Sequence, residues 1–474
     1  MAGEKLFAGA RVRELRERNR LTQVRLARDV GVSASYLNQI EHDRRPLTPG
    51  VLLRISRCLG VEPGALSTDE RARLVAEIAE ATADALEGEP VGPAEIRELV
   101  ARAPRASRAL VLLHRRYRDA LEQARTLAGD GLLTAYEEVR DFFYDRDNYV
   151  GDLDVLAEEL VAEEGIAPGN ARERLVERLA RRHGVEVREL DPREAPEVVR
   201  RFDASSRALA VSRELRPSRQ AFQLATQVAY LEHGERLDEV VAGGGLASDD
   251  ARALARIGLA SYFAGAVLMP YGRFLSSAVE VRYDVERLRA VFDVGFEAAC
   301  HRLSTLQRPG ARGVPFAFVR VDRAGNMSKR QTASSFHFSR VGGACPLWVV
   351  FEAFSDPGRI FRQVAEMPDA RRYLWIARVV RSGHDAFGQP GKTFVVGLGC
   401  DLRHAPSLVY GSGEGLDERG AATLIGPGCK VCDRPACPQR ALPTVGRPLL
   451  VDELTSTFAP YTVVPPKTGA EPVA

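Results

Sequence analysis

The stretch LTQVRLARDVGVSASYLNQIEHDRRPLTPGVLLRISRCLGV, residues 21–61, carries the signals that decide the fold of the N-terminal region. Thr22 is placed to cap a helix and Gly31 to end it, because helix starts favour a side-chain oxygen and helix ends favour glycine. Ser33 is placed to cap a second helix, and Thr48-Pro49 opens a third. With the amphipathic segment that precedes it, this order predicts a helix-turn-helix bundle.

The helix after the glycine turn has a polar face that suits DNA. Amide side chains pair bidentately with adenine, and hydroxyls pair with several bases. Residues 1–60 contain twelve Lys or Arg against six Asp or Glu, which favours a polyanionic partner. The alternative is a small helical bundle with a solvated polar face. We predict double-stranded DNA as the partner, with base or phosphate contacts from Ser33, Ser35, Tyr36, Asn38, Gln39, Arg44 and Arg45.

This region also resembles the phage-repressor-like (XRE-type) helix-turn-helix family, through the pattern LTQ..LA...GVS.SYLNQIE. The match covers about an eighth of the chain. The resemblance implies that the helix beginning near Ser33 is the recognition helix. It also implies that Gln23 lies where the glutamine of that family approaches a phosphate.

The chain from Thr68 to about Leu190 is expected to be mostly helical. Within it, Tyr136, Phe142, Phe143 and Tyr149 form an aromatic stripe that we interpret as core packing. Long helices with apolar faces suit a homodimer, which helix-turn-helix proteins need to read paired half-sites. The longest apolar runs are strand-length, far short of a bilayer span, and the N-terminus has no apolar signal segment, so we expect a cytoplasmic protein.

Residues 217–231 and LARIGLASYFAGAVLMPYGRF resemble the ImmA/IrrE-type metallopeptidase-like domain. Active members carry H-E-x-x-H, in which two histidines hold zinc and the glutamate is the base. Thr226, Gln227 and Tyr230 stand at those positions here, and they cannot make a competent zinc site. His233 nearby is interpreted as a solvated helix-end residue. We therefore expect the fold without the peptidase chemistry, and no enzyme activity.

Further on, the chain alternates between apolar and polar residues in several places. The segments PFAFVRVD, SFHFSR, LWVVFEAF, YLWIARVV and KTFVVGLGCD are predicted strands. They indicate an antiparallel α+β region. Lys329, Arg330 and Arg340 at strand ends are either solvated charges or contacts for the phosphates of a ligand.

Three of the seven cysteines, Cys429, Cys432 and Cys437, fall within GPGCKVCDRPACPQRALP, residues 426–443. The spacing lets two thiolates hold one metal, with a third closing the set, so the pattern favours zinc or an iron–sulfur cluster over a redox switch. The fourth ligand is left open among Cys345, Cys400, His337, His404 and a non-cysteine group. Cys58 and Cys300 lie in apolar helices and are expected in the core.

The segments GNMSKR, GGACPLW, AEMPD, GCDLRHA and the cysteine turn resemble, in order, the C-terminal domain of short-chain fatty acyl transcriptional regulators. The order of the helix-turn-helix, the ImmA/IrrE-like domain and this terminal domain also matches that family, so the resemblance spans nearly the full chain. It implies a regulator of acetate- or propionate-type metabolism, including glyoxylate or methylcitrate metabolism, that senses a short-chain acyl-CoA. Two alternatives remain: a DNA-tethered metallopeptidase of the antirepressor-cleaving type, and an iron or redox sensor without an acyl-CoA effector.

The expected architecture is multidomain, with a mainly α N-terminal half and α+β middle and C-terminal domains. We place a helix-turn-helix domain at residues 1–67 and a helical linker or dimerisation region at 68–150. A degenerate ImmA/IrrE-like domain follows at 151–300, and a C-terminal sensor domain with the cysteine cluster at 301–474.

Overall fold

The computed structural model describes residues 9–59, 68–85, 91–126, 132–334, 344–382, 391–412 and 422–444, except 20, 43, 46, 192, 194, 196, 433, 435 and 436, and also 336, 449, 451, 454 and 455. The chain divides into two compact units. Unit 1 comprises Met1–Arg118, Ser335–Cys345 and Gly426–Ala474, and unit 2 comprises Asp119–Ser334 and Pro346–Ile425. Each unit is described by itself.

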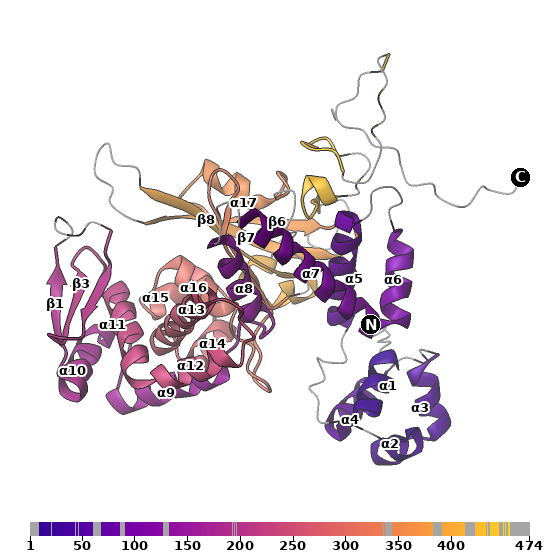
Figure 1. The fold of residues 1–474 in the computed structure, drawn as a ribbon, viewed down its shortest axis with the longest axis horizontal. Coiled ribbons are helices and arrows are strands. Elements are labelled where there is room, and N and C mark those ends of the chain that lie inside the picture. The colour runs from indigo at the N-terminus through magenta and orange to yellow at the C-terminus, as the bar shows by residue number, and fades with distance from the viewer. Residues whose placement is uncertain are drawn as a thin grey trace, which may run out of the picture. The chain divides into compact units, whose positions relative to one another are not determined.

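Unit 1 is helical in its N-terminal part (Figure 1). Its helices are α1 (Gly9–Arg18), α2 (Gln23–Val30), α3 (Ala34–Glu41), α4 (Pro49–Leu59), α5 (Thr68–Ala85), α6 (Pro93–Arg102) and α7 (Pro104–Thr126), the last of which ends in unit 2. Helices α1 to α4 surround one apolar core that includes Val12, Leu26, Leu37 and Ile55. A second cluster joins α5, α6 and α7 through Ile78, Ile96, Val100 and Val111. Helices α1 to α4 thus form the helix-turn-helix bundle with an apolar core that the sequence predicts.

Unit 2 begins with helices that pack around α11 and α13. Its helices are α8 (Leu132–Tyr144), α9 (Gly151–Glu164), α10 (Ala171–His183), α11 (Pro217–Glu232), α12 (Gly234–Ala242), α13 (Asp249–Leu268), α14 (Tyr271–Glu280), α15 (Val285–Val291), α16 (Phe296–Leu303) and α17 (Val349–Glu352). Short 3₁₀ turns follow at Ala353–Ser355, Leu402–Ser407 and Val409–Gly411 in this unit, and at Cys429–Val431 in unit 1.

Helix α13 is long and apolar enough to cross a membrane by length and composition, which the sequence reading did not anticipate. Half of its most apolar window is buried inside the protein. Leu259 and Phe263 of this helix lie in the same apolar cluster as Leu224 and Val228 of α11. This burial is typical of the core helix of a globular unit.

A small three-stranded sheet lies beside α10 and α11 (Figure 1). Its strands are β1 (Glu186–Leu190), β2 (Arg200–Asp203) and β3 (Ala208–Ser212), in the order β1-β3-β2. Strand β1 pairs with β3 in parallel and β2 pairs with β3 antiparallel. The predicted strand at residues 209–211 is confirmed, whereas the helical reading up to Leu190 is wrong at β1.

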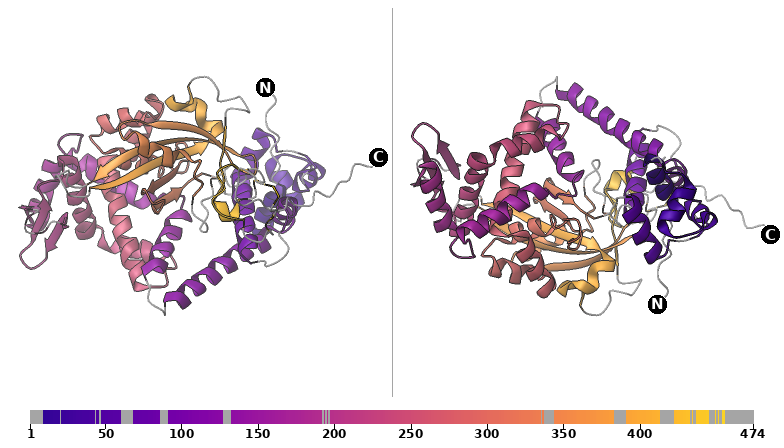
Figure 2. Two further views of the ribbon diagram at one scale, coloured as in Figure 1. Left: turned by 90° about the horizontal axis from the view of Figure 1, so that it is seen from above. Right: turned by 90° about the horizontal axis from the view of Figure 1, so that it is seen from below.

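The larger sheet of unit 2 has six strands in the order β5-β4-β8-β7-β6-β9. Its strands are β4 (Ala317–Val321), β5 (Met327–Thr332), β6 (Phe361–Glu366), β7 (Arg372–Ser382), β8 (Lys392–Asp401) and β9 (Thr423–Leu424). The long antiparallel strands β7 and β8 lie side by side and are drawn in orange in Figure 2. Apolar residues of β4, β7 and β8 share one core with α14 to α16.

Two strand predictions in this region need correction. LWVVFEAF forms α17 and a 3₁₀ turn, because the Gln363 side chain accepts from the Val349 N–H at 3.0 Å and donates to the Leu347 carbonyl at 2.8 Å, which fixes a helix start. The strand that follows β4 along the chain and pairs with it is β5, whereas SFHFSR was expected in that place. Most of SFHFSR lies outside the described residues. The predicted strands YLWIARVV and KTFVVGLGCD are confirmed as β7 and β8.

Candidate functional site

The α2–turn–α3 segment has the caps that the sequence predicted. The Thr22 hydroxyl accepts from the Arg25 N–H at 3.2 Å, and the Ser33 hydroxyl accepts from the Tyr36 N–H at 3.1 Å. Gly31 ends α2 in the left-handed region, with φ of 71°, a conformation that side-chain-bearing residues rarely adopt. Local interactions thus fix the turn between α2 and α3, and the turn sets the angle between these two helices.

The residues predicted to contact DNA lie on or next to α3. Ser35, Asn38, Arg44 and Arg45 are exposed, whereas Gln39 is partly buried. Ser33 is exposed, but its hydroxyl already caps the helix. The Tyr36 ring packs against the apolar core, and the Arg45 guanidinium lies 5.2 Å from the ring centroid. Ser35 and Asn38 therefore present exposed polar groups on α3 itself, and the DNA contacts stay a prediction.

An ion pair beneath this face connects α1, α2 and α3. Arg16 donates from Nε to Glu41 Oε1 at 2.7 Å and from Nη2 to Oε2 at 3.0 Å, and the Glu41 side chain is 1% exposed. Gln23 Nε2 donates to the same carboxylate at 2.9 Å and to Asn38 Oδ1 at 3.2 Å. Gln23 thus holds the Asn38 amide with its carbonyl oxygen toward α2 and its NH₂ group left to donate. The sequence analysis missed Arg16 and Glu41, which lie 25 positions apart.

The positions that hold zinc in active metallopeptidases are engaged otherwise in unit 2. The Thr226 hydroxyl donates to the Phe222 carbonyl at 2.7 Å. Gln227 Oε1 accepts from Arg200 Nη1 at 2.9 Å. The guanidinium groups of Arg200 and Arg256 lie 5.3 and 5.1 Å from the centre of the Tyr230 ring. Gln227 and Tyr230 thus both contact Arg200, and Thr226 is bonded within its own helix. These three side chains make no ligand set for zinc.

His233 is not the solvated residue that the sequence analysis expected. Its ring is partly buried at the end of α11 and packs 4.9 Å from the Phe263 ring, centroid to centroid. Burial lowers the pKa of this imidazole. The neighbouring Glu232 accepts from Arg178 and His183 instead.

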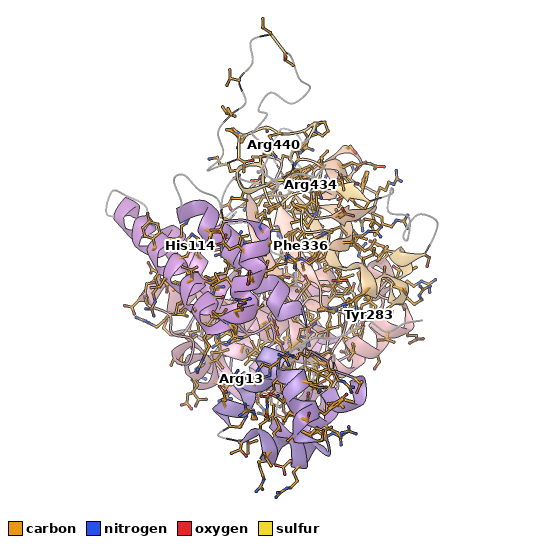
Figure 3. The ribbon with its side chains drawn as sticks, turned by 90° about the vertical axis from the view of Figure 1, so that its right-hand side faces the viewer. Arg13, His114, Tyr283, Phe336, Arg434 and Arg440 are labelled. Carbon is orange, nitrogen blue, oxygen red and sulfur yellow. The ribbon has the colours of Figure 1, made fainter. Side chains whose placement is uncertain are left out.

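The cysteine turn in unit 1 is organised by residues that sequence spacing did not single out. Arg440 is buried and donates to the carbonyls of Cys429, at 3.3 Å, and Cys432, at 3.1 Å. A Cβ atom on Gly426 would lie 2.5 Å from Cys432 Sγ, and Gly428 has φ of 150°, so both positions require glycine. Figure 3 labels Arg434 and Arg440 in this segment.

The donor chemistry of this turn suits a thiolate-bound metal, since three thiols occur within nine positions. Cys432 is buried, and Cys429 and Cys437 are partly buried. Across the described residues, no three His, Cys, Asp or Glu side chains are gathered as a metal-holding group. The metal at this turn therefore stays a prediction.

The other cysteines divide between core and surface. Cys300 is buried in the core as predicted, but Cys58 is exposed, which corrects the prediction for that residue. Cys400 is enclosed in the apolar core of the large sheet, where burial raises the pKa of its thiol. Cys345 is buried, and His404 lies in a 3₁₀ turn after β8. His337 lies outside the described residues.

The basic residues proposed for ligand phosphates have carboxylate partners. Lys329 Nζ lies 3.8 Å from Glu297, and Arg330 Nη2 lies 3.7 Å from Glu137. Arg340 is outside the described residues. Lys329 is exposed, which agrees with its interpretation as a solvated charge, whereas Arg330 is partly buried beside Glu137. The phosphate contacts stay a prediction.

The aromatic stripe is only partly core. Phe142 and Phe143 are buried as predicted. Tyr136 is 41% exposed, and its hydroxyl donates to the Ser328 carbonyl, so it joins α8 to β5. Tyr149 is partly buried, and its hydroxyl accepts from Arg308 Nε at 3.2 Å.

A buried polar network in unit 2 also escaped the sequence analysis. The Asp154 carboxylate accepts from Arg302 Nη2 and, at 2.6 Å, from the Tyr262 hydroxyl. Arg302 Nε donates to the Met269 carbonyl at 2.9 Å. Burial raises the pKa of the Tyr262 hydroxyl well above its usual value, and Asp154 adds to the effect. No local pattern signals this network, because Asp154 and Arg302 are 148 positions apart.

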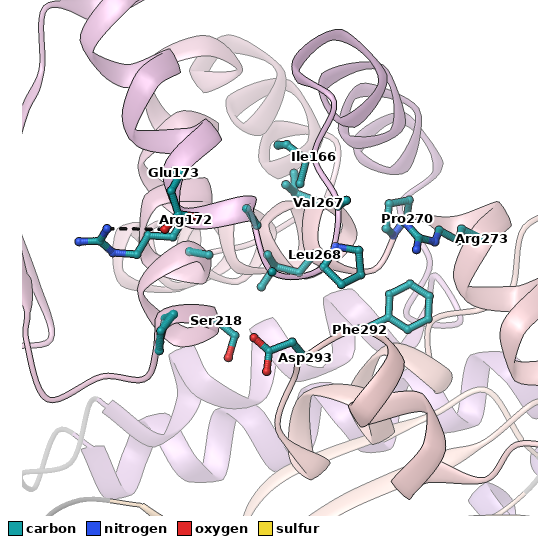
Figure 4. Close-up of a pocket in the computed structure, with 16 residues that line it drawn as sticks. Ile166, Arg172, Glu173, Ser218, Val267, Leu268, Pro270, Arg273, Phe292 and Asp293 are labelled. Carbon is teal, nitrogen blue, oxygen red and sulfur yellow. Dashed lines mark ion pairs between the residues drawn. The ribbon is translucent and has the colours of Figure 1, made fainter.

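A small pocket of about 40 Å³ lies in unit 2 beside the N-termini of α10, α11 and α14 (Figure 4). Arg172 and Arg273 contribute positive charge, and Glu173 and Asp293 contribute negative charge. Such a volume holds a few waters and is far below that of a cofactor-sized site. The pocket in this conformation is thus too small for an acyl-CoA.

Comparison with protein-family models gives three matches in chain order. Residues 12–66 match a helix-turn-helix model, and residues 180–304 match the IrrE N-terminal-like domain. Residues 305–461 match the short-chain fatty acyl coenzyme A regulator C-terminal domain. The order agrees with the resemblance inferred from the sequence.

Curated relatives match over almost the whole chain. The HTH-type transcriptional regulator RamB of Mycobacterium tuberculosis (strain CDC 1551 / Oshkosh) is 49% identical over 473 residues, which cover 97% of this chain and 99% of that protein. The HTH-type transcriptional regulator PrpR of M. tuberculosis (strain H37Rv) is 46% identical, covering 96% and 95%. The propionyl-CoA carboxylase regulator of Cereibacter sphaeroides is 41% identical, covering 97% and 99%.

A solved structure titled Mycobacterium tuberculosis transcriptional regulator is 49% identical and matches with a TM-score of 0.67. It covers 69% of this chain and 99% of that one. The sequence matches are thus joined by a structural counterpart that spans about two thirds of the chain. From the family models and the full-length relatives together, the chain belongs to the short-chain fatty acyl coenzyme A regulator family.

Proposed function

We propose that this protein is a cytoplasmic, DNA-binding transcriptional regulator of short-chain fatty acid metabolism, of the acetate, propionate, glyoxylate or methylcitrate type. The observation that carries the proposal is the polar surface of α3, where Ser35 and Asn38 are exposed over the buried Arg16–Glu41 pair. Its relatives named as transcriptional regulators support the same function.

Base contacts and phosphate contacts have different signatures, which gives the test. Gln39→Ala should lose about 1–3 kcal/mol of binding free energy for the cognate operator and little for random DNA. Arg45→Ala should weaken both and reduce the salt dependence, because it removes a phosphate contact. Fluorescence anisotropy with the upstream region of the regulated operon, at several salt concentrations, measures both effects. Cognate binding at wild-type strength in both variants would remove these residues from the interface.

A short-chain acyl-CoA is the proposed effector. The family model for residues 305–461 and the relative named propionyl-CoA carboxylase regulator support this choice. An effector acts through different affinities for two states of the protein. Acetyl-CoA or propionyl-CoA should therefore shift operator affinity, while free CoA and acetate serve as controls. An operator affinity that none of these ligands changes would refute the effector.

A homodimer is the proposed assembly. On α7, Leu110, Leu113 and Tyr117 recur at helical spacing and are each at least 38% exposed, which a second copy would bury. Two copies would present two α3 helices to paired half-sites. Sedimentation of the wild type and of Leu113→Glu tests this. A wild-type monomer bound to operator one copy at a time would refute it.

We propose no enzymatic role, because Thr226, Gln227 and Tyr230 are engaged as described above. Chelator-sensitive proteolysis by the purified protein would instead support the DNA-tethered peptidase.

The cysteine turn supports a second candidate, an iron or redox sensor. Cys429, Cys432 and Cys437 would hold zinc or an iron–sulfur cluster, which would supply structural cross-linking or redox sensitivity, respectively. Metal analysis and the visible spectrum of anaerobically purified protein distinguish zinc from an iron–sulfur cluster. A redox-dependent operator affinity without any acyl-CoA response would favour the second candidate over the first.

A further inference from the structure

Arg440 lies at the centre of the cysteine turn in unit 1. Its side chain is buried, and its guanidinium donates from Nη1 to the Cys429 carbonyl at 3.3 Å and to the Thr444 hydroxyl at 2.7 Å. From Nη2 it donates to the Cys432 carbonyl at 3.1 Å and to the Arg434 carbonyl. The Thr444 hydroxyl in turn donates to the Cys432 carbonyl at 2.9 Å. One side chain thus ties together the backbone that carries two of the three clustered cysteines.

The acceptors of Arg440 are unusual for a buried cation. Buried charges are costly and are normally paired with an opposite charge. Among the described residues, each hydrogen-bond acceptor of Arg440 is a carbonyl or a hydroxyl oxygen, and none is a carboxylate. Among these described acceptors, the guanidinium charge of Arg440 therefore meets only neutral oxygen atoms.

The backbone of Gly426 also lies close to the Cys432 sulfur. A Cβ on Gly426 would come within 2.5 Å of Cys432 Sγ, so any other residue there would displace the sulfur. Cys432 is 6% exposed. The Cys432 sulfur therefore lies against the backbone of Gly426. The Cys432 carbonyl accepts hydrogen bonds from Arg440 and Thr444, which hold the peptide that carries this sulfur.

We propose that Arg440 is the positioning residue of the cysteine turn, which holds the backbone of Cys429 and Cys432 in place so that their thiols can bind a metal. The metal part of the proposal rests on the proposed function, whereas the positioning part does not. Residues that orient metal ligands in this way typically change metal affinity by about 10- to 100-fold when they are replaced.

The test compares Arg440→Gln with Lys430→Gln in the full-length protein. Lys430 is exposed in the same turn, so its replacement removes one positive charge without touching the carbonyls. Iron and zinc per chain, and the rate at which a chelator removes them, are measured first. We expect Arg440→Gln to lose metal about 10- to 100-fold faster than the wild type, and Lys430→Gln to match the wild type. Arg440→Lys should also lose metal faster than the wild type, because an ammonium group cannot reach the same set of acceptors.

A second readout does not depend on bound metal. In chelator-treated protein, alkylation of Cys432 is followed by mass spectrometry, and Arg440→Gln should expose this thiol and speed the reaction at least about tenfold. Thr444→Val, a milder change, should speed it by less. Circular dichroism and operator affinity verify that the variants are folded.

The outcomes separate the two parts. A wild type without metal, together with faster alkylation in Arg440→Gln, keeps the positioning role and removes the metal from the proposed function. Retention of metal and alkylation of Cys432 at wild-type rates in Arg440→Gln would overturn the inference, as would full rescue by Arg440→Lys.

Discussion

Replacement of Glu41 by alanine should unfold the DNA-binding helices locally. Its carboxylate is 1% exposed and accepts two hydrogen bonds from Arg16, at 2.7 and 3.0 Å, and one from Gln23 at 2.9 Å. Hydrogen bonding to Glu41 is the main cause that raises the pKa of Arg16. Removing one partner of a buried pair typically costs about 3–5 kcal/mol, because the other charge stays buried and unpaired.

The lower end of that range applies here. The Arg16 side chain is 12% exposed and also donates to the Leu21 carbonyl at 3.0 Å, so it keeps one partner and some water. We expect a loss of about 3 kcal/mol, which corresponds to roughly a hundredfold increase in the exchange rate of protected amides. Gln23 would also lose the carboxylate that holds it beside Asn38, so operator affinity should fall.

Hydrogen exchange with mass spectrometry on the full-length protein measures this change in peptides that cover α3. The control is Arg13→Ala, which removes the α1 ion pair with Glu17, whose two side chains are each 54% exposed. Exposed helical pairs contribute about 0.3–0.5 kcal/mol, so exchange should rise about twofold at most. If Glu41→Ala and Arg13→Ala exchange at similar rates in α3, the buried pair does not stabilise the fold as reasoned.

Three further predictions concern unit 2 and the cysteine turn. Gly399→Ala places a Cβ 2.4 Å from the Trp375 ring, so urea unfolding should show a loss of about 1–3 kcal/mol, and an unchanged midpoint would contradict it. Burial opposes ionisation of Glu232, but hydrogen bonds from Arg178 and a histidine outweigh it and lower the pKa to about 2 from 4.5. The stability from this carboxylate should therefore be lost as the pH falls from about 5 to 2, and Glu232→Gln should show a shallower decline in urea titrations across that range. Cys432→Ser should reduce the effect of acyl-CoA on operator affinity more than it reduces operator affinity itself. Ligand titrations in which the variant and the wild type respond equally would show that the cysteine turn plays no part in sensing.

The sequence by itself determined the elements whose signals are local. Thr22 and Ser33 cap their helices as predicted, because a capping hydroxyl needs only a backbone N–H three residues away. Gly31 ends α2 because its positive φ needs no tertiary support. Strands β7 and β8 also form where the sequence predicts strands, in segments whose β-branched and aromatic residues suit a sheet.

Only the tertiary structure decided the features that join distant residues. LWVVFEAF was predicted as a strand, since a short apolar run fits a strand or a helix, and contacts with Gln363 on β6 select the helix. Glu41 looks like an ordinary surface acid until α1 places Arg16 against it. Arg440 looks like one more charge after the cysteines until the turn buries it against their carbonyls. Local hydrogen bonds can be predicted from spacing along the chain, whereas the burial of a charge depends on which distant segments cover it, and that is decided by packing.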